Sequence, residues 1–252
     1  MDMPSPSFSE ADAVLGAIES RRSVRGFLGR PVPPPLVERI LAAAARAPSA
    51  NNSQPWRVHV LTGAGRQRLT DAIMAVRAAG GDEPAPEYQY DPQKWPEPYL
   101  SRRRTNGWAL YGLLGIHKGD RAKGRSWNDE NYRFFGAPVG VTLTRDRRLG
   151  LGSLIDLGMF MEAMAVAARA LGLDTCPQAA FAHYHAVVRE TLQLPPEDMV
   201  VCGMSLGFAD ETATANRLRT EREPVAGFAT FHPGAEPAGN GPANNDGAAP
   251  HG

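Results

Sequence analysis

Cysteine is scarce in this chain: only Cys176 and Cys202 occur among its 252 residues. Two thiols cannot build a disulfide framework or a four-cysteine zinc site, so a reducing compartment, the cytoplasm, is expected. A surplus of either charge is also missing, because 27 Lys and Arg residues balance 27 Asp and Glu residues. A nucleic-acid binder needs excess cations to displace counterions from its ligand, so this balance argues against a nucleic-acid partner.

Long hydrophobic runs are absent as well. No stretch of the sequence approaches the roughly 20 apolar residues that a membrane-spanning helix requires. Residues 1–10 have neither a cationic start nor an apolar core, and so do not read as a secretory signal. We therefore expect a protein that neither crosses nor binds a membrane.

The composition fits one globular domain between two tails. Hydrophobic residues make up 42% of the chain and charged residues 21%, as is typical of soluble domains. Residues 1–10 are a predicted N-terminal tail, and residues 233–252 are a predicted flexible C-terminal tail. The C-terminal tail has almost no large apolar side chain with which to offset its ordering entropy. Residues 11–232 then form the domain.

Hydrophobic periodicity predicts both helices and strands. Helical spacing covers residues 12–22, a segment from Leu36 to a point before Pro48, and residues 66–79, 100–114, 153–171 and 182–194. Strand patterns cover residues 56–61, 138–144 and 199–208. Ser153 and Asp156 have the spacing of a capping box, and Gly172 follows the same helix where a C-terminal cap belongs. Because strands and helices do not alternate as regular βαβ units, the expected class is α+β.

Two clusters in the first quarter of the chain are suited to ligand binding. Residues 21–25, Arg-Arg-Ser-Val-Arg, end the first predicted helix, and their guanidiniums can bind phosphate oxygens. Alternatively, these cations simply complement the negative end of that helix. Residues 47–56, A-P-S-A-N-N-S-Q-P-W, place short polar side chains between two prolines. This run is either a capped turn or a rigid polar wall for a heterocycle.

Three later segments add to this pattern. Residues 172–181, G-L-D-T-C-P-Q-A-A-F, contain small residues that let a flat ligand approach the backbone. Residues 216–224, N-R-L-R-T-E-R-E-P, offer more arginines for a phosphate, or form a solvated charged loop. Residues 83–98 contain five prolines and several aromatic side chains, and such a long irregular segment is typical of a lid or a wall.

Other reactive or charged residues have plainer explanations. Cys176 has no positioned histidine near it in sequence, so a buried small residue is favoured over a redox thiol. His183 and His185 diverge on a helix without a carboxylate at ligand spacing, and no metal site is predicted. Residues 102–104, three arginines, form either a solvated helix face or a cation for a substrate carboxylate.

Four of these segments together resemble the flavin-dependent nitroreductase family, namely residues 21–25, 47–56, 172–181 and 216–224. The likeness is closest to bacterial members that reduce nitroaromatic compounds. The resemblance runs from about Ala11 to Phe231, and the A-P-S-A-N-N-S-Q-P-W run carries most of it. It implies an α+β fold with a central, mainly antiparallel sheet flanked by helices, in an intertwined homodimer. It also implies FMN at the subunit interface, NADH or NADPH as electron donor, and ping-pong reduction of nitroaromatics or quinones.

The resemblance also implies which residues contact the flavin. Arg21 and Ser23 would hold the FMN phosphate, with Arg22 beside them. Arg222 and Arg219 would complete the phosphate site. Arg25 would lie near N1 and the C2 carbonyl. The other subunit would line the ring through Pro48, Ser49, Ala50 and Asn52, and the flavin edge near N5 would be followed by Pro177, Gln178 and Ala179. Many relatives have a Glu-Gly pair at 178–180, and the segment Tyr88–Tyr99 has no residue-by-residue match.

The leading hypothesis is an FMN-dependent NAD(P)H oxidoreductase that reduces nitroaromatic compounds to hydroxylamines or amines. Hydride transfer to N5 leaves negative charge on the N1–C2 edge, which a fixed cation such as Arg25 stabilises. Because the cofactor performs the redox step, no side chain is assigned as catalytic and none as a metal ligand. Alternatives are a reductive dehalogenase or another flavin reductase of the same fold, and a flavin-binding protein without turnover.

Overall fold

The computed structural model describes residues 8–80 and 83–232, and the chain divides into two units, Met1–Leu218 and Arg219–Gly252. The second unit contains a short 3-10 helix, Val225–Gly227. Helix α1, Phe8–Ser20, begins inside the predicted N-terminal tail, whereas residues 1–7 and the predicted C-terminal tail lie outside the described residues. No helix in the described ranges is long and apolar enough to cross a membrane.

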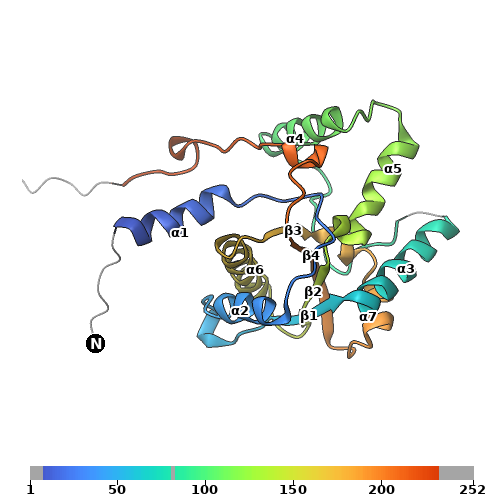
Figure 1. Cartoon of the computed structure of the whole chain (residues 1–252), viewed down its shortest axis with the longest axis horizontal. Helices are drawn as coiled ribbons and strands as arrows, with labels where there is room; N and C mark the ends of the chain where they lie inside the picture. The colour runs from blue at the N-terminus through green and yellow to red at the C-terminus, as the bar shows by residue number, and fades with distance from the viewer. Residues whose placement is uncertain (1–7, 81–82, 233–252) are drawn as a thin grey trace, which may run out of the picture. The chain divides into compact units, whose positions relative to one another are not determined.

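A four-stranded antiparallel sheet forms the centre of the first unit (Figure 1). Its strands, in the spatial order β1-β2-β4-β3, are β1 Arg57–Thr62, β2 Val139–Asp146, β4 Asp198–Gly207 and β3 Asp174–Gln178. Three of them were expected from their hydrophobic patterns. Strand β3 was not, because its sequence D-T-C-P-Q has no run of β-branched or aromatic residues. The predicted α+β class with an antiparallel sheet is confirmed.

Helices cover both faces of this sheet. Their bounds are α2 Pro34–Ala44, α3 Gly63–Ala79, α4 Tyr99–Leu113, α5 Arg121–Asp129, α6 Gly152–Ala170 and α7 His185–Leu192. Figure 1 shows α2 and α6 on one side of the strands and α3 and α7 on the other. One core cluster contains Ile40 of α2 and Leu157 of α6, and the other contains Leu69 of α3 and Val188 of α7. Burial of these apolar side chains on both faces is the main driving force for this arrangement.

Glycines in the two central strands let aromatic rings lie directly against the sheet. A Cβ at Gly203 would be 2.3 Å from the ring of Phe181, and a Cβ at Gly140 would be 2.6 Å from the ring of Phe134. These rings stack with their centroids 4.8 Å apart. Because Phe181 comes just after β3, this packing anchors the chain immediately beyond residues 177–179.

Two helix predictions need correction. Ser153 is not the cap of α6, whose N-cap is Leu151. The Ser153 hydroxyl instead donates to Gly150 O at 2.7 Å and accepts from Arg145 at 2.9 Å. The helix predicted over 182–194 starts only at His185, because residues 179–182 form a 3-10 turn. By contrast, Gly172 has φ +75°, which fits its predicted place after the end of α6.

Candidate functional site

The first arginine cluster lies against the edge of β3. Ser23 forms a parallel bridge with Thr175, and the Val24 N–H donates to Thr175 O at 3.0 Å. This pairing occupies the edge of β3 that faces away from β4, so an open strand edge is covered. The fold therefore brings together two clusters that lie about 150 residues apart in sequence.

Asn216, the first residue of the last cluster, joins the same place. Its side chain is buried, with Oδ1 accepting the Arg25 N–H at 2.7 Å. Its Nδ2 donates to Gly26 O at 2.8 Å and to Asp210 O at 2.9 Å. A saturated buried amide of this kind fixes the backbone around Arg25. Arg219 and Arg222 belong to the second unit, and their contribution to a phosphate site stays a prediction.

The three arginines of the first cluster have different partners. Arg21 pairs with Glu162 of α6 at 3.2 Å. Arg22 pairs with Glu211 at 2.8 Å and also donates to the carbonyl of Asn216. The half-buried Arg25 donates only weakly, to Ser23 O at 3.5 Å, and no carboxylate among the described residues pairs with it. Of the three guanidiniums, that of Arg25 is thus the one without a carboxylate partner in the described ranges.

The three residues predicted along the flavin edge point in different directions. Gln178 is buried: its Nε2 donates to Asn131 O at 2.5 Å, and its Oε1 accepts from the Ser205 hydroxyl at 2.7 Å. Its side chain is therefore committed to the core, so only its backbone is left to contact a ligand. Pro177 and Ala179, by contrast, line a cavity.

The cavity has a volume of about 270 Å³ and neutral walls. Its lining residues are Tyr88, Tyr90, Leu154, Leu157, Gly158, Met161, Pro177, Ala179, Val201 and Cys202. The rings of Tyr88 and Tyr90 meet edge to face with centroids 6.2 Å apart. Burial raises the pKa of both tyrosines, and it raises the pKa of the Cys202 thiol to about 12. All of these side chains are therefore uncharged near neutral pH, and the site suits a flat apolar molecule.

The Ser49–Asn52 loop is separate from these residues within one chain. It forms a 3-10 turn whose Ala50 N–H donates to the Asp156 carboxylate of α6 at 3.3 Å. Asn51 and Asn52 have φ values of 50° and 56°, in the left-handed region that asparagine tolerates. Ala50 and Asn52 are exposed, and no hydrogen bond or ion pair links the loop to residues 21–25 in the described ranges. The loop is thus ordered but faces outward.

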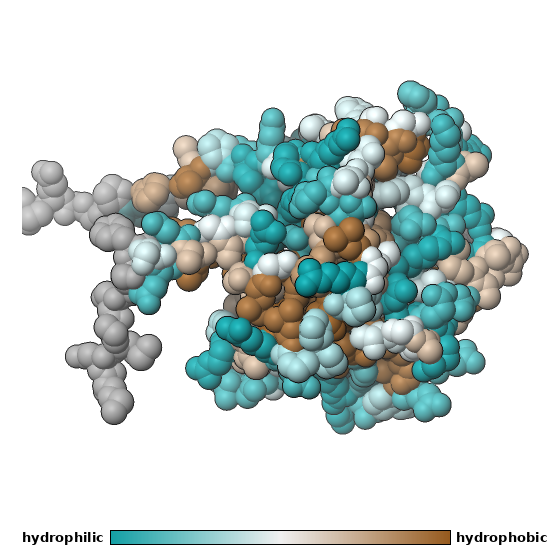
Figure 2. Space-filling view, viewed as in Figure 1, coloured by the Kyte–Doolittle hydropathy of each residue, from teal (hydrophilic) through white to brown (hydrophobic). Residues whose placement is uncertain are grey.

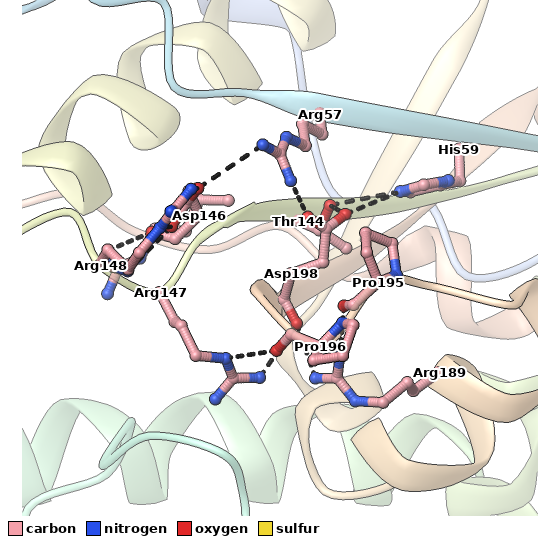
Figure 3. Close-up of polar contacts among 11 residues, drawn as sticks. Arg57, His59, Thr144, Asp146, Arg147, Arg148, Arg189, Pro195, Pro196 and Asp198 are labelled. Atoms are coloured by element: carbon pink, nitrogen blue, oxygen red, sulfur yellow. Dashed lines mark hydrogen bonds and ion pairs between the residues drawn. The ribbon is translucent and has the colours of Figure 1, made fainter.

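A polar network surrounds the first residue of β4, at the end of that strand that does not pair with β3 (Figure 3). Its centre is Asp198, which is 1% exposed and pairs with Arg57, while its second carboxylate oxygen accepts from Thr144 at 3.1 Å. His59 lies 3.9 Å from the same carboxylate. Arg147 and Arg189 donate to the Asp198 carbonyl at 3.1 and 2.6 Å. The buried carboxylate of Asp198 thus has a cationic partner and its carbonyl is hydrogen-bonded, which explains how this residue tolerates burial.

Several groups that organise the site had no sequence signal for that role. Asp156 had only its capping-box spacing from Ser153, Ser205 is a single polar residue in a strand pattern, and Asn131 lies where no element was predicted. Only the folded chain places them beside the predicted motifs. In the structure, His183 bonds Pro84 O at 2.8 Å and His185 lies 3.8 Å from Glu87. No cluster of His, Cys, Asp and Glu in the described part of the chain has the makings of a metal site. A larger cavity, of about 600 Å³, lies beside α3 and α5 and includes none of the predicted cofactor residues.

The chain is similar in both sequence and structure to proteins that reduce nitro compounds. The model of the Nitroreductase family matches residues 18–208. The chain is 42% identical over 214 residues to a nitrobenzene nitroreductase of Ectopseudomonas oleovorans, covering 85% of this chain and 94% of the relative. It is 41% identical over 220 residues to a 4-nitrobenzoate reductase of Pseudomonas putida, covering 87% and 94%. The structure of an FMN and NADPH-dependent nitroreductase, NfnB from sphigopyxis sp. strain HMH, superposes with a TM-score of 0.85 at 37% identity, covering 87% of this chain and 99% of that one.

Proposed function

This chain belongs to the nitroreductase family, and we propose that it is an FMN-dependent NAD(P)H oxidoreductase that reduces nitroaromatic compounds by a ping-pong route. The single observation that carries the proposal is the juxtaposition of the Arg21–Arg25 segment with β3, beside a neutral cavity lined by Pro177 and Ala179. FMN, when bound there, supplies hydride acceptance at N5 and the electrons that reduce the nitro group.

The residues present fit such a cofactor. Arg25 offers a guanidinium without a carboxylate partner in the described ranges, which suits the N1–C2 edge where charge develops. Arg21, Arg22 and Ser23 lie within the same turn of chain and would hold the phosphate. Pro177, Ala179 and the backbone of Gln178 would follow the ring edge. The protein thereby binds and orients the cofactor and stabilises the charge that develops on it. No side chain has to donate or remove a proton at a carbon atom.

A homodimer completes this proposal. The exposed Ser49–Asn52 loop would reach a flavin only across a subunit interface, because its own chain directs it away from residues 21–25. Apolar side chains suited to such an interface are exposed on α1 and at the start of α6, and they include Leu15, which is 53% exposed, and Ile155, which is 69% exposed. Figure 2 shows hydrophobic surface next to α6 on the face in view. Contiguous exposed apolar surface of this kind is typical of an interface.

Steady-state kinetics test the function. The rate of NADPH oxidation by the FMN-loaded protein should rise with nitrobenzene concentration. Double-reciprocal plots at several nitrobenzene concentrations should give parallel lines, and the product should be hydroxylaminobenzene or aniline. A protein that retains FMN but does not turn over would instead be a flavin store or sensor. With 4-chloronitrobenzene, chloride release without loss of the nitro group would identify a reductive dehalogenase. The dependence on NAD(P)H also agrees with the proposed cytoplasmic location.

A further inference from the structure

Strand β4 has an irregularity where it passes the cavity. In its pairing with β2, Cys202 lies opposite Leu143 and Val200 lies opposite Thr144, so Val201 has no partner across the sheet. On the other side of β4, β3 reaches only as far as Gly203. Val200 and Val201 are buried, and buried backbone groups require hydrogen-bond partners from elsewhere.

Two consecutive residues of a distant segment supply these partners. The Glu87 carboxylate accepts the Val200 N–H at 2.8 Å, and the Tyr88 hydroxyl donates to Val201 O at 2.8 Å. The register slip of β4 thus serves as the attachment point of the segment that carries the aromatic cavity wall. Tyr88 itself lines the cavity, and Tyr90 follows two residues later.

Glu87 is also the charged centre of this attachment. Its Oε1 accepts from Arg147 at 2.5 Å and from Arg189 at 3.0 Å, and His185 lies 3.8 Å from Oε2. Its side chain is only 8% exposed. The two arginines also bond the Asp198 carbonyl, so Glu87 joins the segment to β4, to α7 and to the β2–α6 connection at once. Charge-assisted bonds of this kind are stronger than neutral ones and hold a defined geometry.

We propose that Glu87 is a positioning residue that holds the Tyr88–Tyr90 wall at the distance an aromatic substrate requires, without touching the substrate. This inference rests on the proposed function, because the cavity beside Pro177 and Ala179 is where the nitroarene would meet the flavin. The Glu87 carboxylate fixes the residue that precedes the wall, and the hydroxyl of Tyr88 fixes the first residue of the wall. Loss of the Glu87 charge therefore widens the cavity and weakens arene binding.

The test is the Glu87→Gln variant of the FMN-loaded enzyme, which keeps an oxygen for the Val200 N–H but loses the charge that faces the two arginines. Loss of a charge-assisted hydrogen bond corresponds to about tenfold in a binding equilibrium. We expect the KM for nitrobenzene to rise about tenfold, with FMN content and the rate of anaerobic flavin bleaching by NADPH within about twofold of wild type. Glu130→Gln, which breaks the 3.0 Å pair between Glu130 and Arg133, is the matched control and should leave all three values unchanged.

Two outcomes overturn the inference: an unchanged KM for nitrobenzene, or an equal loss of FMN content, flavin bleaching and nitrobenzene reduction, which is the pattern of a merely structural residue. If Glu87→Gln does not fold, Arg147→Gln takes its place, since Arg147 is 41% exposed and also bonds Glu87. The same KM-selective loss is then expected, and an unchanged KM again refutes the role of Glu87. Failure of the proposed function is distinct, because the wild-type enzyme itself would then lack nitrobenzene turnover.

Discussion

The carboxylate of Asp156 accepts the backbone N–H of Ala50, with both of its oxygens 3.3 Å from that nitrogen. Asp156 is 5% exposed and lies on α6, whereas Ala50 begins the exposed turn of the Ser49–Asn52 loop. The bond therefore holds the loop in place, although two of its residues, Asn51 and Asn52, have positive φ. In the proposed dimer, α6 of one subunit thus prepares the loop that lines the flavin of the other.

Removal of this acceptor should weaken FMN binding. Asp156→Ala leaves the Ala50 N–H without its acceptor, which destabilises the ordered loop by about 1–3 kcal/mol. The Kd for FMN should therefore rise roughly tenfold or more. Titration of flavin fluorescence measures that Kd. Asp156→Asn keeps an acceptor oxygen and should recover most of the affinity. Equal FMN affinity in wild type and Asp156→Ala would show that the loop does not reach the flavin.

Gln178 should matter more for stability than for cofactor contact. Gln178→Ala leaves the carbonyl of Asn131 and the hydroxyl of Ser205 with one partner fewer in the core, a loss of about 1–3 kcal/mol in the free energy of unfolding. Because only the backbone at 178 is free for the flavin, FMN affinity measured at a temperature where the variant is folded should stay within about threefold. Denaturant unfolding and flavin titration measure the two effects. A large loss of FMN affinity with unchanged stability would mean that the side chain contacts the cofactor.

Arg25 should act on electron transfer rather than on cofactor retention. Arg25→Ala removes the cation proposed near N1 and the C2 carbonyl, so flavin reduction by NADPH should slow by roughly a hundredfold, an effect typical of removing one preorganised charge-stabilising group. FMN affinity should fall far less, since other residues hold the phosphate. Stopped-flow bleaching and flavin titration separate the two quantities, with Arg39→Ala on α2 as control. Equal losses of both would refute the role of Arg25.

His59 should make the fold less stable in mild acid. Burial, and to a smaller extent the charge of Arg57, lowers the pKa of His59 below 6.5. The unfolded chain then binds more protons than the folded chain in the window below pH 6.5, so stability is full above 6.5 and falls as pH decreases toward the folded-state pKa. The His59→Gln variant should lose less Tm than wild type between pH 7 and pH 5.5. Identical losses of Tm would contradict this coupling.

The cavity should favour neutral nitroarenes over charged ones. All of its lining side chains are uncharged. The charge of Arg145 acts to lower the pKa of Tyr88, but its guanidinium already donates to Leu149 O at 2.6 Å and to the Ser153 hydroxyl at 2.9 Å. A buried carboxylate without a partner is costly, so kcat/KM for nitrobenzene should exceed that for 4-nitrobenzoate by about tenfold or more. Met161→Lys should narrow this difference. A preference for 4-nitrobenzoate in the wild type would show that a cation reaches the substrate from elsewhere.

Local patterns predicted much of the fold but less of the site. Apolar periodicity located the strands β1, β2 and β4, because their side chains enter a core. The pattern failed for β3, whose place depends on pairing with β4 and Ser23, and for α5, whose polar sequence R-A-K-G-R-S-W-N-D has no apolar stripe. The motifs contain residues 23–25, Thr175 and Asn216, which meet within one chain, but they did not predict the inward turn of Gln178. The bonds of Glu87 and Asp156 join residues far apart in the chain, and no local signal encodes them.

An anaerobic absorbance titration of the purified protein decides whether this chain is an FMN-dependent nitroreductase. We expect the bands of oxidised flavin, their bleaching on addition of NADPH, and their return when nitrobenzene is added to the reduced protein after excess NADPH has been removed. A protein that is colourless and does not take up added FMN would refute the proposed function. So would bound flavin that NADPH bleaches but that nitrobenzene leaves reduced.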